Sequence, residues 1–211
     1  MKAFGTIPDA DQFHLTGGTA LAYFYLKHRR SNDLDFFTAV ADLLQPFSLQ
    51  LETHLSELGL TLEKQRGFHT FVEYHVRRNS EATIIQLAQD SPFRLQPTVS
   101  FPEFPDLKVE NLTDIAANKL TALFGRAALR DFVDIYAILR TGKFTEEELI
   151  ANAQKKDAGF DIYWLGVAFG RIRQFKEDAT DMLLLDGTLP LQTLRTFFGE
   201  WQERLKKKLL H

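Results

Sequence analysis

The chain has 211 residues, of which 45% are hydrophobic and 25% charged, and its formal net charge is −3. This balance is typical of a soluble globular protein; it excludes a disordered chain, a fibre and a coiled-coil rod, and it argues against a protein coated in positive charge to bind nucleic acid. The absence of cysteine excludes a disulfide framework, a thiol nucleophile and cysteine-bound zinc. With no apolar run near the ~18 residues of a membrane span and no secretory signal at the N-terminus, we expect a cytoplasmic protein that does not contact a membrane.

The first half of the chain alternates between strand-like and helix-like segments. Period-two or β-rich runs predict strands, and helical spacing of apolar residues predicts helices, the longer one ended by Gly59. The predicted strands are 13–16, 33–37, 68–76 and 82–88, and the predicted helices are 19–28 and 42–58. This order predicts an α/β domain with a mixed sheet.

A proline-rich segment separates this half from the rest. Residues 91–107 hold four of the seven prolines and should run extended, because proline fixes φ and lacks a donor. We therefore predict two domains, 1–107 and 108–211. The second is an all-helical bundle, with predicted helices at 112–124, 131–139, 145–154, about 160–178, and 191–210.

Gly17 and Gly18 stand between a predicted strand and a predicted helix. Glycines there let a phosphate approach the backbone at a helix N-terminus, although a plain tight turn would also explain them. The motif is not a Walker A loop, because the lysine and spacing of that loop are missing.

Asp33 and Asp35 lie on one face of the next predicted strand, with origins ~7 Å apart. Two carboxylates on one face suit Mg²⁺ held together with substrate phosphates; the alternative is the polar side of a solvated strand. A basic run, His28-Arg29-Arg30, precedes the pair and is explained equally well as a helix C-terminus stabilised by cations.

Three further positions in the helical half are candidates for chemistry. Lys119 shares a helix face with apolar residues, so it either reaches solvent by snorkelling or contacts a phosphate, and Arg126 lies two turns further on. Asp131 and Asp134 open the following helix, where a capping role would explain them without any function.

Taken together, these motifs resemble the AbiEii/AbiGii toxin family of nucleotidyltransferases. LTGGTALAYFYLKHRRSNDLDFF (15–37) resembles its first motif, DIAANKLTALFGR (114–126) its lysine motif and RDFVDIYAIL (130–139) its last motif. The three occur in the family's order, and the final 60 or so residues carry no motif of this kind.

The resemblance implies a polymerase-β-like nucleotidyltransferase fold with a helical C-terminal domain. It implies Mg²⁺-dependent transfer of a nucleoside monophosphate from a nucleoside triphosphate (NTP), with RNA such as tRNA as the expected acceptor and a cognate antitoxin as the expected partner. The implied nucleotide-binding residues are Gly17, Gly18, Thr19, Arg30, Ser31 and Arg126. The implied metal ligands are Asp33 and Asp35, and the implied catalytic residues are Asp35, Lys119, Asp131 and Asp134.

One position departs from the wider superfamily, which often has a third carboxylate on a later strand. The corresponding strand, 82–90, has Gln86 at its centre, and an amide cannot accept a proton as a base does. Asp134 or Asp131, or more weakly Glu73, could replace it. The alternatives are a catalytically degenerate nucleotide-binding or regulatory module, and an enzyme that modifies a protein or small-molecule hydroxyl.

Overall fold

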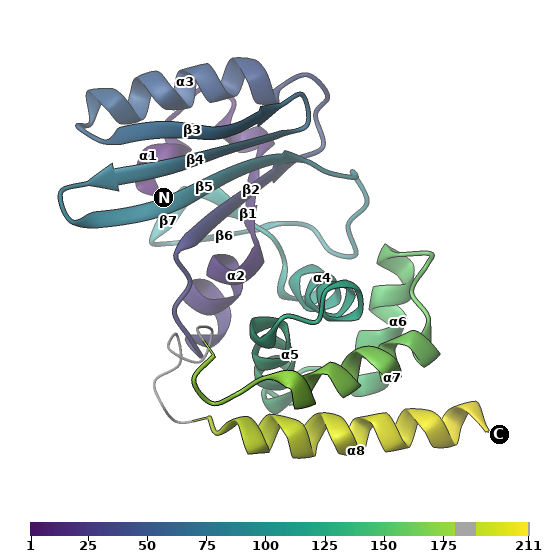
Figure 1. Cartoon of the computed structure of the whole chain (residues 1–211). Helices are drawn as coiled ribbons and strands as arrows, with labels where there is room; N and C mark the ends of the chain where they lie inside the picture. The colour runs from purple at the N-terminus through teal and green to yellow at the C-terminus, as the bar shows by residue number, and fades with distance from the viewer. Residues whose placement is uncertain (180–188, 211) are drawn as a thin grey trace. The chain divides into compact units, whose positions relative to one another are not determined.

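The computed structural model describes residues 1–179 and 189–210, and the chain forms two compact units (Figure 1). Unit 1 comprises Met1–Phe24 and Ser31–Asn111, and unit 2 comprises Tyr25–Arg30 and Leu112–His211. Each unit is described by itself below.

Unit 1 is built on a mixed seven-stranded sheet in the order β3-β4-β5-β2-β1-β7-β6. Strand β2 is antiparallel to β1 and parallel to β5, and β1 is parallel to β7. The strands are β1 (His14–Thr16), β2 (Asp33–Thr38), β3 (Thr61–Phe68), β4 (Phe71–Arg78), β5 (Glu81–Gln89), β6 (Val99–Phe101) and β7 (Phe104–Val109). The accompanying helices are α1 (Lys2–Gly5), the 3₁₀ turn η1 (Ala10–Gln12), α2 (Gly17–Thr19), the π-helix η2 (Ala20–Leu26) and α3 (Leu44–Glu57).

One face of this sheet carries the core of unit 1. Helix α3 runs alongside β3, β4 and β5 (Figure 1), and its Phe47 is fully buried together with Phe36 of β2 and Tyr74 of β4. Phe4 of α1 stacks on Phe36 with ring centroids 3.6 Å apart. Side chains alternate along a strand, so the residues between these apolar ones are directed to the opposite face of the sheet.

The predicted α/β domain with a mixed sheet is confirmed, with local differences. The helix predicted over 19–28 is a short α2 followed by a π-helix, and it ends early because Lys27 adopts a left-handed φ of 52°. Strand β3 was not predicted, because all but one of its residues are exposed and mostly polar. The proline-rich segment forms the edge strand β6 and most of β7, which lies between β6 and β1.

Unit 2 is helical, as predicted. Its core gathers large side chains from several helices, including Phe132, Phe198 and Trp201, none of which is exposed to solvent. Among the described residues, no helix is long and apolar enough to cross a membrane. The helices are α4 (Leu112–Gly125), α5 (Leu129–Arg140), α6 (Glu146–Lys156), α7 (Ile162–Gly170), the 3₁₀ turn η3 (Arg171–Gln174) and α8 (Leu191–Leu209).

Candidate functional site

Asp35 occupies the middle of the sheet of unit 1. Strand β2 pairs with β1 on one side and β5 on the other, which places Asp35 opposite Thr16 and opposite Gln86. Directly paired residues point to the same face of a sheet, so these three side chains lie on the face opposite the Phe36 core. Asp33, two residues earlier on β2, belongs to the same face.

The turn after β1 brings Gly17 against Asp35. Gly17 has φ +72°, and a Cβ at this position would lie 2.1 Å from Asp35 Oδ2. Both the backbone conformation and the close approach therefore require glycine here. The buried Thr19 hydroxyl donates to the carbonyl oxygen of Asp33, which ties the start of the helical turn to the start of β2.

These residues of unit 1 fit a hard divalent cation. Asp33 and Asp35 share a face and are half-buried, and the carboxylate of Asp33 has no hydrogen-bond or ion-pair partner within the described part of the chain. No group of three or more His, Asp or Glu side chains among the described residues forms a complete metal cage. Mg²⁺ commonly binds through one or two carboxylates and completes its shell with substrate phosphates and water, so a pair is sufficient.

Asp35 lies in a row of polar side chains that crosses the sheet. On the β5 side, Gln86 is paired with Glu73 of β4, and Gln86 Nε2 donates to Glu73 Oε2 at 2.7 Å. On the β1 side, the Thr16 hydroxyl donates to the carboxylate of Glu110, which is 1% exposed. No local sequence pattern predicts that Glu110 belongs to this row, because its contact with Thr16 depends on β7 pairing with β1.

In unit 2, the carboxylate of Asp134 gathers three basic side chains. Lys119 Nζ of α4 lies 2.8 Å from Oδ2, and Arg29 donates through Nε to Oδ1 at 2.7 Å and through Nη2 to Oδ2 at 3.0 Å. His28 Nε2 also lies 2.7 Å from Oδ1. Asp134 is fully buried and Lys119 is 7% exposed, so the lysine does not snorkel to solvent.

The charge balance of this cluster favours the ionised carboxylate. Burial alone would raise the pKa of Asp134, but the Lys119 ammonium and the hydrogen bonds from Arg29 and His28 outweigh it and hold the pKa well below its usual range. One carboxylate thus contacts two permanent cations, Lys119 and Arg29. His28 Nδ1 is buried without a hydrogen-bond partner among the described residues.

Asp131 performs the capping work that its position at the start of a helix suggested. Its carboxylate accepts from the backbone N–H of Ala128 at 3.2 Å and from Arg126 Nε at 2.9 Å. These contacts satisfy a donor at the N-terminus of α5 and leave Asp131 fully buried. The structure thus groups Arg126 with Asp131 and Lys119 with Asp134.

In the basic run before β2, Arg29 rather than the predicted Arg30 contacts the Asp134 cluster. Arg30 is exposed and its side chain has no partner among the described residues, whereas Arg29 is buried on Asp134. Ser31 is half-buried in unit 1. Arg29 and His28 were not among the predicted site residues, although both lie in the basic run that precedes Asp33 in the sequence.

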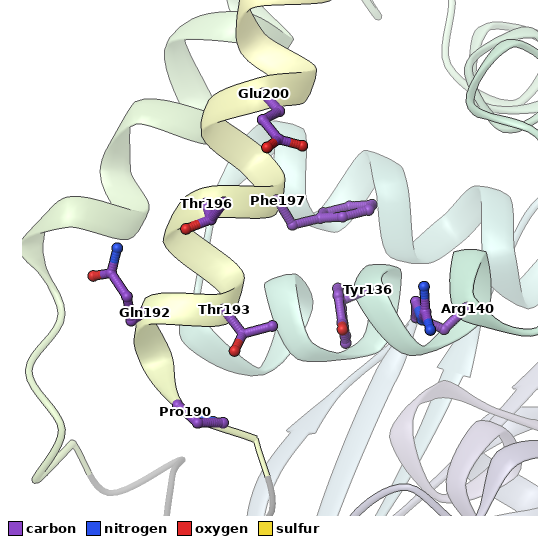
Figure 2. Close-up of a pocket in the computed structure, with 8 residues that line it drawn as sticks. All are labelled: Tyr136, Arg140, Pro190, Gln192, Thr193, Thr196, Phe197 and Glu200. Carbon is purple, nitrogen blue, oxygen red and sulfur yellow. The ribbon is translucent and has the colours of Figure 1, made fainter.

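Unit 2 also contains a groove of about 550 Å³ between α5 and α8 (Figure 2). Tyr136 and Phe197 form its aromatic wall, with ring centroids 5.1 Å apart and planes at 88°. The side chain of Thr193 points toward Tyr136, while Arg140 and Glu200 add one charge of each sign (Figure 2). None of these polar side chains has a hydrogen-bond partner among the described residues, and no residue predicted for the site lines the groove.

Both the sequence and the fold are similar to those of known proteins. The family described as nucleotidyl transferase AbiEii toxin, type IV toxin–antitoxin system, matches residues 1–207. No curated protein matches the chain.

Three solved structures share the fold, which confirms the expected nucleotidyltransferase architecture. An H. pylori protein classed as a nucleotidyltransferase has 18% identity and a TM-score of 0.61, over 99% of this chain and 90% of its own. JHP933 from Helicobacter pylori has 19% identity and a TM-score of 0.57, over 99% and 88%. MenT4, a nucleotidyltransferase toxin from Mycobacterium tuberculosis H37Rv, has 18% identity and a TM-score of 0.50, over 81% and 63%.

The contact between Gly17 and Asp35 can be tested with two matched glycine variants. Gly59 has a similar φ of +76°, but no atom lies within 4 Å of the position a Cβ would take. Gly59→Ala therefore introduces the same backbone strain without a steric contact. We expect both variants to lose about 1–2 kcal/mol of unfolding free energy, measured by urea titration. Only Gly17→Ala should lose the Mg²⁺-induced rise in melting temperature, because its methyl group displaces Asp35. Equal metal responses in the two variants would contradict this role of Gly17.

The Asp134 cluster predicts an acid-sensitive unit 2. Asp134→Asn removes the buried carboxylate that Lys119 and Arg29 both contact and should cost about 3–5 kcal/mol. Because the folded-state pKa of Asp134 is lowered, its stabilisation is complete above about pH 5 and is lost as the pH falls. Both tryptophans, Trp164 and Trp201, lie in unit 2, so their fluorescence during urea unfolding reports on this unit.

The control for this prediction is Glu203→Gln, which removes an exposed carboxylate paired only with Lys206 at the surface. It should leave the unfolding curve unchanged. An Asp134→Asn variant with the wild-type pH dependence below pH 5 would show that the cluster does not hold this carboxylate ionised.

Proposed function

Because the chain belongs to the AbiEii nucleotidyltransferase toxin family, we propose that it transfers a nucleoside monophosphate from an NTP to a hydroxyl group of RNA, with Mg²⁺ on the phosphates. The observation that carries this proposal is the contact between the Asp35 carboxylate and the bare backbone of Gly17. Without a side chain at Gly17, the carboxylate lies directly against the backbone where a strand turns into a helix, and backbone N–H groups at such a turn can bind phosphate.

In unit 1, Asp33 and Asp35 would hold Mg²⁺, and the turn at Gly17, Gly18 and Thr19 would hold the triphosphate through backbone N–H groups. When bound, Mg²⁺ neutralises phosphate charge and aligns the α-phosphate for in-line displacement. The acceptor oxygen forms a bond to the α-phosphorus as the bond to the bridging oxygen breaks. Pyrophosphate leaves with the bonding electron pair, and the proton of the hydroxyl passes to a base.

In unit 2, we assign the stabilisation of phosphate charge to the Asp134 cluster. Lys119 and Arg29 are two permanent cations held on one carboxylate, and cations suit the negative charge that develops on pyrophosphate. Asp134 holds both cations in place before substrate binds, so the site does not have to reorganise. Arg126 and Arg30 are further candidates for phosphate contact.

We do not assign the proton transfer to Asp134. Both of its oxygens already accept from cations, and its pKa lies well below the usual range, so it is a weak base. Asp131 is equally committed to Arg126 and to the start of α5. We propose that Asp134 acts as a positioning residue for Lys119 and Arg29.

RNA is the acceptor that the distribution of surface groups favours. Arg77 and Arg78, at the turn between β4 and β5, are exposed and have no ion-pair partner among the described residues. The tail of α8 contributes less, because Lys206 pairs with Glu203 and Lys208 pairs with Glu147. The groove between α5 and α8 suits one nucleotide, with its base against Tyr136 and Phe197 and its phosphate on Arg140. The family further suggests a cognate antitoxin as a partner.

The transfer itself is tested by incubating each ³²P-labelled NTP with Mg²⁺ and total cellular RNA. We expect wild type to label RNA with at least one nucleotide. Asp35→Asn should reduce labelling at least 1,000-fold, and Lys119→Met about 100-fold or more, because each removes a group that stabilises the transition state. Asp11→Asn, an exposed aspartate of unit 1, is the control.

The outcomes separate the proposal from its alternatives. NTP-induced thermal stabilisation without labelling of RNA, protein or small molecules would indicate a catalytically silent nucleotide-binding module. Labelling of protein but not RNA would show that the acceptor is a protein hydroxyl. Neither stabilisation nor labelling with any NTP would contradict nucleotide transfer.

The groove makes a separate prediction about the acceptor. Arg140→Ala should weaken binding of single-stranded RNA about tenfold, because one cation and its phosphate contact are lost. Lys207→Ala removes one exposed cation of α8 outside the groove and should weaken it much less. Fluorescence anisotropy of a labelled oligoribonucleotide at fixed salt measures both. An equal loss of RNA affinity in the two variants would mean that binding depends only on net charge and that RNA does not occupy the groove.

A further inference from the structure

The transfer proposed above needs a group that removes the proton of the attacking hydroxyl, and the buried aspartates of unit 2 are committed to cations. We infer that Glu73 is this general base and that Gln86 is the residue that positions it. The inference rests on the proposed function, since without transfer there is no hydroxyl proton to remove.

Glu73 lies on the face of the sheet that carries Asp35, two strands away. The register runs from Asp35 of β2 to Gln86 of β5 and from Gln86 to Glu73 of β4. Neighbouring strands are about 4.8 Å apart, so the backbones at Glu73 and Asp35 are about 10 Å apart. This separation leaves room for a substrate between the two side chains, with reacting atoms about 3–3.5 Å apart and a proton transfer to Glu73 over about 2.6–3.2 Å.

Gln86 supplies what a general base needs from its surroundings. Its amide Nε2 donates to Oε2 of Glu73 at 2.7 Å, which fixes the plane of the carboxylate. Oε1 remains available, since Arg66 Nε approaches it only to 3.8 Å and the arginine side chain is 63% exposed. A neutral amide between Glu73 and Asp35 also avoids placing a third negative charge directly beside the metal-binding pair.

The other groups near the row suit the role less well. Glu110 is 1% exposed and its carboxylate accepts from the Thr16 hydroxyl, so an acceptor hydroxyl cannot reach it. His75 shares the strand and face of Glu73 but has no hydrogen-bond partner among the described residues to orient its ring. The side chain of Glu73 is 14% exposed, so it is largely shielded from water but an acceptor hydroxyl can still reach it.

The first test is Glu73→Gln, which keeps the size and hydrogen-bonding capacity of the side chain and removes the basic carboxylate. The kcat for transfer should fall about 100-fold or more, with the KM for NTP and the urea midpoint unchanged. Glu63→Gln, on β3 opposite His75, removes a carboxylate from the same face and should leave kcat unchanged. An unchanged kcat in Glu73→Gln, or an equal loss in Glu63→Gln or His75→Asn, would overturn the inference.

The second test separates a base from a merely structural side chain. Glu73→Ala should be as slow as Glu73→Gln, and added formate should raise its rate in proportion to concentration, because a small carboxylate can take the vacated position. Formate should not accelerate Asp35→Asn. A folded Glu73→Ala variant that formate does not rescue would overturn the assignment, whereas a wild type that transfers no nucleotide would overturn the proposed function and this inference with it.

Discussion

Strand β2 hydrogen-bonds to β1 on one side and to β5 on the other, so the neighbours of every side chain on it are set by register. A shift of one residue would exchange Phe36 and Asp35 between the faces of the sheet, burying a charge and exposing an aromatic ring. The fully buried Phe36 and its stacking on Phe4 therefore determine where Asp35 lies. The apolar core of unit 1 and the polar row on the opposite face both result from side chains alternating between the two faces of the sheet.

The same register explains why the turn after β1 needs glycine. Thr16 ends β1 opposite Asp35, so the next residue meets the carboxylate as the chain turns away from the sheet. Gly17 meets both demands, a positive φ and an absent Cβ. The glycine turn and the aspartate strand are thus adjacent because β1 and β2 are antiparallel neighbours, although about 15 residues separate Gly17 from Asp33 in the sequence.

Unit 2 depends on a different interaction, a buried charge cluster whose members come from three separated parts of the chain. His28 and Arg29 precede β2, Lys119 lies on α4 and Asp134 on α5, yet all meet at one carboxylate. Burying such a cluster costs solvation energy that a well-packed apolar group would not, which makes it weak as a source of stability. In the proposed function the cluster has a different use: it holds two cations in place for phosphate before substrate binds.

The sequence by itself determined the class of each half, most of the long helices, the strands with strong alternation and the aspartate pair on one face of β2. These follow from local periodicity and turn chemistry, which need no knowledge of distant residues. Three motifs in order were also sufficient to identify the family, now shown by the match over residues 1–207. Local patterns could not distinguish Arg29 from Arg30, because both follow the same helix and only burial separates them.

Only the tertiary structure decided which side chains contact one another. Strand β3 could not be seen in the sequence, since as an exposed edge strand it has no apolar alternation, and its place comes from pairing with β4. The proximity of Glu73 to Gln86 likewise depends on the register between β4 and β5, and that of Glu110 to Thr16 on the pairing of β7 with β1, which are distant in sequence. Hydrophobic periodicity reports which side of an element is buried, whereas register and long-range contacts decide what that side meets.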